Sequence, residues 1–168
     1  IHAQDLETAI QVLVNSGAIE SEPQYELELR IPAGLATSAQ QIRAWQGLAV
    51  LGYGFRPFFL GAAAFAAMAM AVWIGALSGT WSIPSAYGPV EWHAHEFMWG
   101  YLPAVIAGFL FTAIPNWTGR LPIVGVPLAV LWCFWFAGRL AMFVSGSMPI
   151  VLAAAIDLSF LTVLLAVV

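Results

Sequence analysis

The sequence has very little charge and no lysine. Charged residues make up 8% of its 168 residues, against about 25% in an ordinary soluble domain. All five cationic residues are arginines. So few cations cannot form the basic surface that binds nucleic acid, and we expect no nucleic acid partner. The hydrophobic residues, 61% of the total, indicate that a lipid bilayer surrounds most of the chain.

Cysteine is also scarce. The single Cys133 excludes an internal disulfide and a thiolate-rich metal site. It lies in an apolar run, where we expect it to be a small buried hydrophobic residue. The absence of a basic stretch at the start argues against a signal peptide. Because the chain starts at Ile1 and stops at Val168 inside an apolar stretch, we expect an internal fragment of a longer protein, missing residues at both ends.

The few charges are concentrated in residues 1–56, which hold six of the nine acids and three of the five arginines. Residues 5–17 (DLETAIQVLVNSG) have helical spacing of apolar residues, and residues 25–31 (YELELRI) alternate as a strand does. One helix and one strand cannot bury a core. We therefore expect residues 1–45 to be a short soluble α/β segment and linker belonging to an upstream domain.

The remainder, residues 46–168, contains four long apolar stretches. About 20 apolar residues in a helix are enough to cross a bilayer. The sequence predicts an all-α membrane protein, an antiparallel bundle of four transmembrane helices. The predicted spans are 57–79, 89–114, 122–144 and 149–168.

The arginines outside the spans predict the orientation of the bundle. Arg30, Arg43 and Arg56 precede the first span, and Arg120 lies between the second and third. The loop 79–91 has no arginine. Cytoplasmic loops of membrane proteins carry an excess of cationic residues, so we expect the N-terminus and Arg120 on the cytoplasmic side.

Four ionisable residues lie inside the predicted spans: His93, Glu96, Arg139 and Asp157. Counted at about 1.5 Å per residue, all four fall in the outer half of the bilayer. Such residues are costly in lipid and are candidates for function. Arg139 and Asp157 have similar depths on consecutive helices, which favours a structural ion pair over a direct ligand role.

The stretch from His93 to Glu96 suggests ligand chemistry. Residues two apart on a helix point about 200° apart, so His93 and His95 cannot chelate one metal from one face. His93 and Glu96 share a face. His93 is thus a candidate ligand for a metal or haem iron, and His95 faces another helix or a second site. The alternative is that both histidines form hydrogen bonds near the membrane interface.

Three motifs in order, residues 54–60 (GFRPFFL), 87–96 (YGPVEWHAHE) and 107–120 (AGFLFTAIPNWTGR), make the chain resemble the NnrS family over about residues 48–168. These are bacterial inner-membrane proteins of the nitric oxide response, described as containing haem and copper. The resemblance implies haem and copper as cofactors, with His93, His95 and Glu96 as the leading contacts. Arg56 and Arg120 are candidates to pair with haem propionates or anionic lipid, and both are equally explained as topology signals.

Three functions stay open from the sequence. The first is a haem and copper protein that senses or detoxifies nitrosative stress. The second is part of a transporter or channel, with His93, Glu96, Arg139 and Asp157 lining a polar site in the outer leaflet. The third is a structural or partner-binding piece whose cofactor pocket needs the missing remainder of the chain. Whether the protein catalyses a reaction is not predicted.

Overall fold

The computed structural model describes residues 45–168 of the chain. The helix expected at 5–17 and the strand expected at 25–31 lie outside this part. Within residues 45–168 every regular element is helical. The first is a short 3-10 turn, η1 (Ala49–Leu51), which precedes the long helices.

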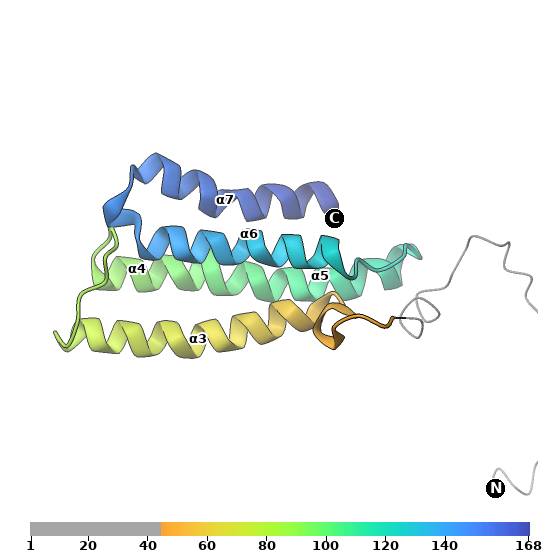
Figure 1. Ribbon diagram of the computed structural model, residues 1–168, viewed down its shortest axis with the longest axis horizontal. Helices are drawn as coiled ribbons and strands as arrows, with labels where there is room; N and C mark the ends of the chain where they lie inside the picture. Colours follow the sequence, from red (N-terminus) through yellow and green to blue (C-terminus); the bar gives the residue numbers. More distant parts are fainter. Residues whose placement is uncertain (1–44) are drawn as a thin grey trace, which may run out of the picture. The chain divides into compact units, whose positions relative to one another are not determined.

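Four long helices run back and forth to form one bundle (Figure 1). The first is α3 (Phe55–Leu77). The second runs without interruption from Pro89 to Thr118 and the others are α6 (Val126–Phe143) and α7 (Ile150–Val167). All four are long and apolar enough to cross a membrane. The prediction of a four-helix membrane bundle is thereby confirmed.

The second long helix changes its geometry along its length. It begins as α4 (Pro89–His95), continues as a π-helix, η2 (Glu96–Tyr101), and ends as α5 (Leu102–Thr118). The amide of Leu102 donates to the carbonyl of Phe97, five residues back, as a π-helix requires. Pro103 follows at once, has no amide hydrogen, and would press its ring against the carbonyl of Trp99 in a regular α-helix. The wider turn relieves that contact.

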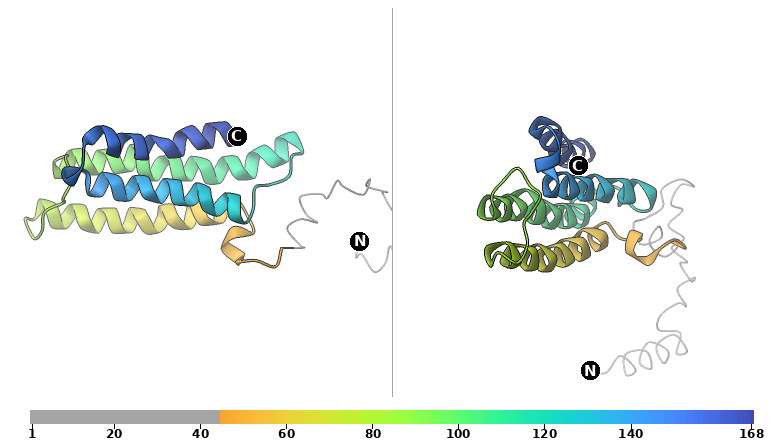
Figure 2. Two further views of the ribbon diagram at one scale, coloured as in Figure 1. Left: turned by 45° about the horizontal axis from the view of Figure 1, so that its top comes forward. Right: turned by 60° about the vertical axis from the view of Figure 1, so that its left-hand side comes forward.

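Two pairs of helices make the main packing contacts in the bundle. α3 packs mainly on α5, and α7 packs mainly on α6 (Figures 1 and 2). Aromatic rings join these layers: Phe58 of α3 lies against Phe111 of α5 and Phe160 of α7, with ring centroids 5.6 and 5.7 Å apart. Small residues such as Ala62, Ala104 and Ala107 are fully buried. They allow the close helix approach that membrane bundles use.

The ends of the bundle are held by turns. α5 ends at Gly119, whose φ of 69° is a left-handed conformation that favours glycine. At the opposite end, a 3-10 turn, η3 (Ser145–Ser147), joins α6 to α7. It also holds the loop between α3 and α4, because the buried Ser145 Oγ accepts a hydrogen bond of 2.9 Å from the amide of Ala86. The loop is therefore fixed over this end of the bundle.

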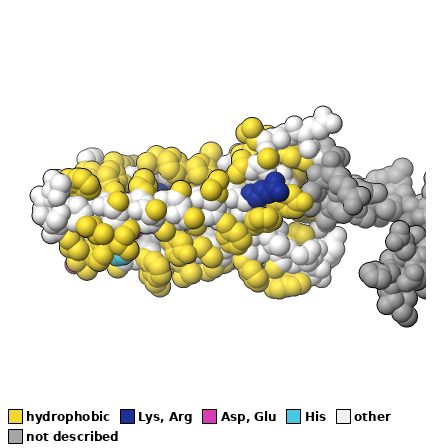
Figure 3. All heavy atoms as spheres, turned by 90° about the horizontal axis from the view of Figure 1, so that it is seen from below, with side chains coloured by type: hydrophobic (Ala, Val, Ile, Leu, Met, Phe, Trp, Pro, Cys, Tyr) yellow, Lys and Arg dark blue, Asp and Glu magenta, His cyan; other side chains and the backbone are white. Residues whose placement is uncertain are grey.

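Hydrophobic side chains are spread over the face of the bundle seen in Figure 3. Exposed large side chains occur along every long helix, as expected where lipid is the solvent. Cys133 is exposed on α6, so the expectation that it is buried was wrong. An apolar run in a membrane helix has a lipid-facing side as well as a core side, and hydrophobicity alone does not distinguish them.

Candidate functional site

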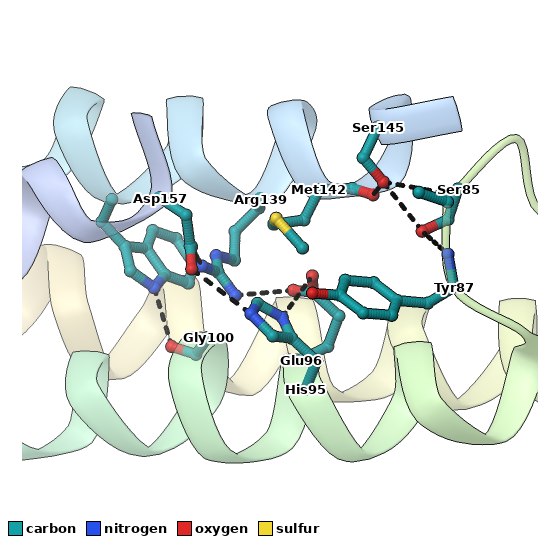
Figure 4. A network of polar contacts seen from close by, with 11 residues as sticks. Ser85, Tyr87, His95, Glu96, Gly100, Arg139, Met142, Ser145 and Asp157 are labelled. Atoms are coloured by element: carbon teal, nitrogen blue, oxygen red, sulfur yellow. Dashed lines mark hydrogen bonds and ion pairs between the residues drawn. The ribbon is translucent and has the colours of Figure 1, made fainter. Parts of the chain in front are cut away.

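Three charged residues lie in the interior of the bundle near the α3–α4 loop. Glu96 of η2, Arg139 of α6 and Asp157 of α7 are 1%, 5% and 6% exposed. They come from three different helices and point toward one another (Figure 4). Buried charges in lipid need partners, and here each is the partner of another.

Arg139 is the centre of this group. Its Nη1 donates to Glu96 Oε2 at 2.7 Å, and its Nη2 donates to Asp157 Oδ1. The structure thus places Arg139 in contact with Asp157, the partner considered from the sequence, and adds Glu96 as a second. One guanidinium joins η2, α6 and α7, because its planar fork can bond two carboxylates at once.

His95 completes the group. Its Nε2 lies 3.3 Å from Asp157 Oδ2, and its Nδ1 lies 3.5 Å from Glu96 Oε1. A neutral imidazole carries one N–H and one lone pair, whereas both nitrogens here face a carboxylate oxygen. The ring of His95 therefore lies between the two carboxylates that Arg139 binds. We call His95, Glu96, Arg139 and Asp157 the charge network.

Glycine residues let the helices approach closely enough for the charge network to form. A Cβ at Gly100 would touch Arg139 Nη1 and lie 2.9 Å from Glu96 Oε2. A Cβ at Gly138 would lie 3.0 Å from Asp157 Oδ1. The carbonyl of Gly100 also accepts a 2.8 Å hydrogen bond from the indole of Trp135, on α6. α6 is therefore fixed against the π-helix by two residues one turn apart, Trp135 and Arg139.

The loop between α3 and α4 covers the charge network from the end of the bundle. The ring of Tyr87 stacks on His95, with centroids 5.7 Å apart and planes 17° apart (Figure 4). Next to it, Ser85 Oγ lies 3.0 Å from Ser145 Oγ. The carbonyl of Pro84 accepts a hydrogen bond from the amide of Gly146 at 3.1 Å. These contacts fix the tyrosine over the histidine.

His93 lies apart from the charge network, on the side of the helix that faces α3. Its ring stacks on Trp73 with centroids 4.1 Å apart and planes 14° apart. Its Nδ1 is buried and has no hydrogen-bond partner within residues 45–168. His93 and His95 thus point to different neighbours, and no metal ion can be shared between them in this arrangement.

A pocket of about 280 Å³ lies beside His93, between α3 and the second helix. Glu96 lines the same pocket, so the two residues that the helical spacing assigned to one face do open to one space. The carboxylate oxygen Oε1 of Glu96 is buried and forms no hydrogen bond with the described residues. The other walls are apolar or aromatic: Phe65, Ala66, Ala69, Met70, Phe97 and Tyr101.

The other candidate residues lie elsewhere. Arg56 and Arg120 are both at the opposite end of the bundle, and Arg56 is roughly 25 Å along α3 from Trp73 at 1.5 Å per residue. Arg56 donates to the carbonyl of Ala49 at 2.7 Å. Within the described part of the chain, no group of three or more His, Cys, Asp or Glu side chains could hold a metal ion.

Four apolar helices around a buried charge network define a helical membrane protein. A family model described as NnrS protein matches residues 49–168. The chain belongs to the NnrS family, as its three motifs indicated. No curated protein and no solved structure matches the chain.

Proposed function

We propose that this chain contributes the membrane-embedded, haem-binding part of a protein that senses or removes nitrosative stress. The proposal places it in a bacterial inner membrane, with the N-terminus and Arg120 on the cytoplasmic side. Membership of the NnrS family supports the assignment to the nitric oxide response. The observation that carries the haem assignment is the environment of His93.

His93 is the residue that would hold a haem iron. Imidazole is a common ligand of haem iron, and this ring is oriented by its stacking on Trp73. It lines a pocket whose walls are mainly apolar and aromatic, which supports an occupant with a flat hydrophobic face. A bound haem would supply an iron that binds nitric oxide. The protein would supply the ring nitrogen, its orientation and the mainly apolar pocket.

The described residues do not fit copper in the same way. His95, the second candidate ligand, has both ring nitrogens directed at carboxylates of the charge network. The metal-ligating side chains among residues 45–168 form no cluster of three. Copper stays part of the proposal through the family alone, and we assign it no ligand and no chemical step in this chain.

The test is an absorption spectrum of the intact detergent-solubilised protein, reduced minus oxidised, with iron and copper analysis. We expect a Soret band with stoichiometric iron. The variant His93→Ala should lose it, whereas His95→Asn should keep it, because His95 serves the charge network. Full haem content in a folded His93→Ala protein would contradict the ligand assignment.

A second candidate function, solute or ion transport, is favoured by the charge network itself. Buried ionisable residues in a bundle often mark a transport path, and the second helix adopts a wider, π-helical turn beside them. This function predicts a colourless protein even from haem-replete cells. It also predicts flux in proteoliposomes that changes in the variant Asp157→Asn.

A further inference from the structure

The end of the bundle that carries Arg120 has an apolar groove between the start of α6 and the end of α7. Its volume is about 620 Å³. The residues that line it are Pro122, Ile123, Val124, Val126, Pro127, Val130, Leu131, Val163 and Val167. All are aliphatic or proline, so the groove offers no side chain that can form a hydrogen bond. Its occupant must be a hydrocarbon or another apolar surface.

A second, smaller pocket connects this groove to Arg120. Arg120 and Leu121 line it, and it shares Ile123 and Val167 with the groove. The apolar walls therefore continue up to the base of a cationic side chain at the end of the spans. An apolar surface that ends at a cation matches a molecule with a hydrocarbon chain and an anionic head.

The two arginines at this end of the bundle differ in their availability. The guanidinium of Arg56 donates to the carbonyl of Ala49 and lies 4.2 Å from the ring centroid of Tyr53. Arg120 is exposed, and its guanidinium bonds no residue in the described part of the chain. Among residues 45–168 its five N–H donors have no partner, and Arg binds phosphate well because two of these donors match two phosphate oxygens.

We propose that the groove binds one anionic phospholipid, with its phosphate on Arg120 and an acyl chain along α6 and α7. The charge favours an anionic lipid over a zwitterionic one, because the ammonium of a zwitterionic headgroup competes with Arg120 for the phosphate. The aliphatic walls of α6 and α7 accept the chain without leaving a polar group unpaired. This site is separate from the haem pocket and does not depend on the proposed function.

The test uses the intact purified protein, delipidated in detergent and titrated with phosphatidylglycerol or phosphatidylcholine, with bound lipid read by native mass spectrometry. We expect phosphatidylglycerol to bind with one high-affinity site. The variant Arg120→Gln should weaken that binding by roughly fivefold, the contribution of one cation near an anionic headgroup. Arg120→Lys should restore part of it. The matched control Arg56→Gln removes a cation from the same end and should leave the binding unchanged.

Three results would overturn the proposal. Equal binding of the two lipids would show that the groove accepts any acyl chain without reading charge. Equal losses in Arg120→Gln and Arg56→Gln would show general attraction to the cationic end of the bundle. No saturable binding would show that protein covers the groove, either another part of the same chain or a second copy.

Discussion

The central residue of the site is Arg139, and its burial explains why the charge network holds together. A guanidinium that is 5% exposed among lipid-facing helices is tolerated because two carboxylates and its own hydrogen bonds compensate it. The compensation is mutual, because Arg139 is the one arginine that contacts the buried carboxylates of Glu96 and Asp157 among the described residues. The network should therefore respond strongly to the loss of one member.

We expect Arg139→Gln to destabilise the protein by about 3–5 kcal/mol, since it leaves two buried carboxylates facing each other. Thermal unfolding in detergent, followed by circular dichroism, measures the effect. Arg120→Gln is the matched control, because the same change at an exposed position should cost about 0.5 kcal/mol or less. Similar midpoints for the two variants would show that the charge network contributes little to stability.

Among single residues, the sequence grouped three members of the charge network and missed the fourth. Depth counting grouped His93, Glu96, Arg139 and Asp157 in one half of the bilayer, and the structure brings the last three together. The sequence did not predict that His95 joins them. Rotation about a helix axis gives the angle between two residues, but it does not give the neighbour that each one faces. The sequence also did not predict that position 100 needs glycine, because the nearest atom that a Cβ there would meet belongs to Arg139 of α6.

At the scale of single elements, the π-helix is the feature that shapes the site. It lies between the histidines and Pro103, and it contains both Glu96 and Gly100. A wider turn alters which carbonyls have a partner within the helix. Here the carbonyl of Gly100 accepts the indole N–H of Trp135. The geometry of the π-helix and the packing of α6 against it are therefore linked.

We expect Trp135→Phe to destabilise the protein by about 1–3 kcal/mol, because it removes a buried donor from the carbonyl of Gly100. In the Trp135→Phe protein, hydrogen exchange measured by mass spectrometry should also be faster in residues 96–101 than in α3. Trp117→Phe, at a side chain that is 71% exposed, is the control. If both variants exchange alike, the link between Trp135 and the π-helix would be refuted.

The sequence predicted the long helices because about 20 predominantly apolar residues in a row are a strong signal that needs no knowledge of neighbours. The second helix extends to Thr118, beyond the 89–114 of the sequence prediction. The helix continues through Pro115, which lies inside α5, and stops at Gly119, four residues later. The π-helix was not predicted. Pro103 indicates that a helix hydrogen bond is missing near it, but no local pattern shows where the wider turn lies.

For the whole molecule, the distribution of polar groups divides the bundle into two ends with different chemistry. The charge network and His93 lie toward the α3–α4 loop, whereas Arg56 and Arg120 lie at the other end. The positive-inside rule predicts the proposed haem pocket in the outer half of the membrane and the proposed lipid site at the cytoplasmic surface. Both assignments depend on one orientation, which can be measured directly.

Cysteine labelling of the intact protein in cells tests that orientation. The background is Cys133→Ser, which removes the single native thiol from α6. Ser82→Cys then places a thiol in the exposed α3–α4 loop, and Thr118→Cys places one at the exposed end of α5. We expect a membrane-impermeant maleimide to label position 82 in intact cells and position 118 after permeabilisation.

The opposite pattern would put Arg120 outside, and both the outer location of the haem pocket and the positive-inside argument would fail together. Labelling of both positions in intact cells would show that the second helix does not cross the bilayer, against the length and composition of residues 89–118.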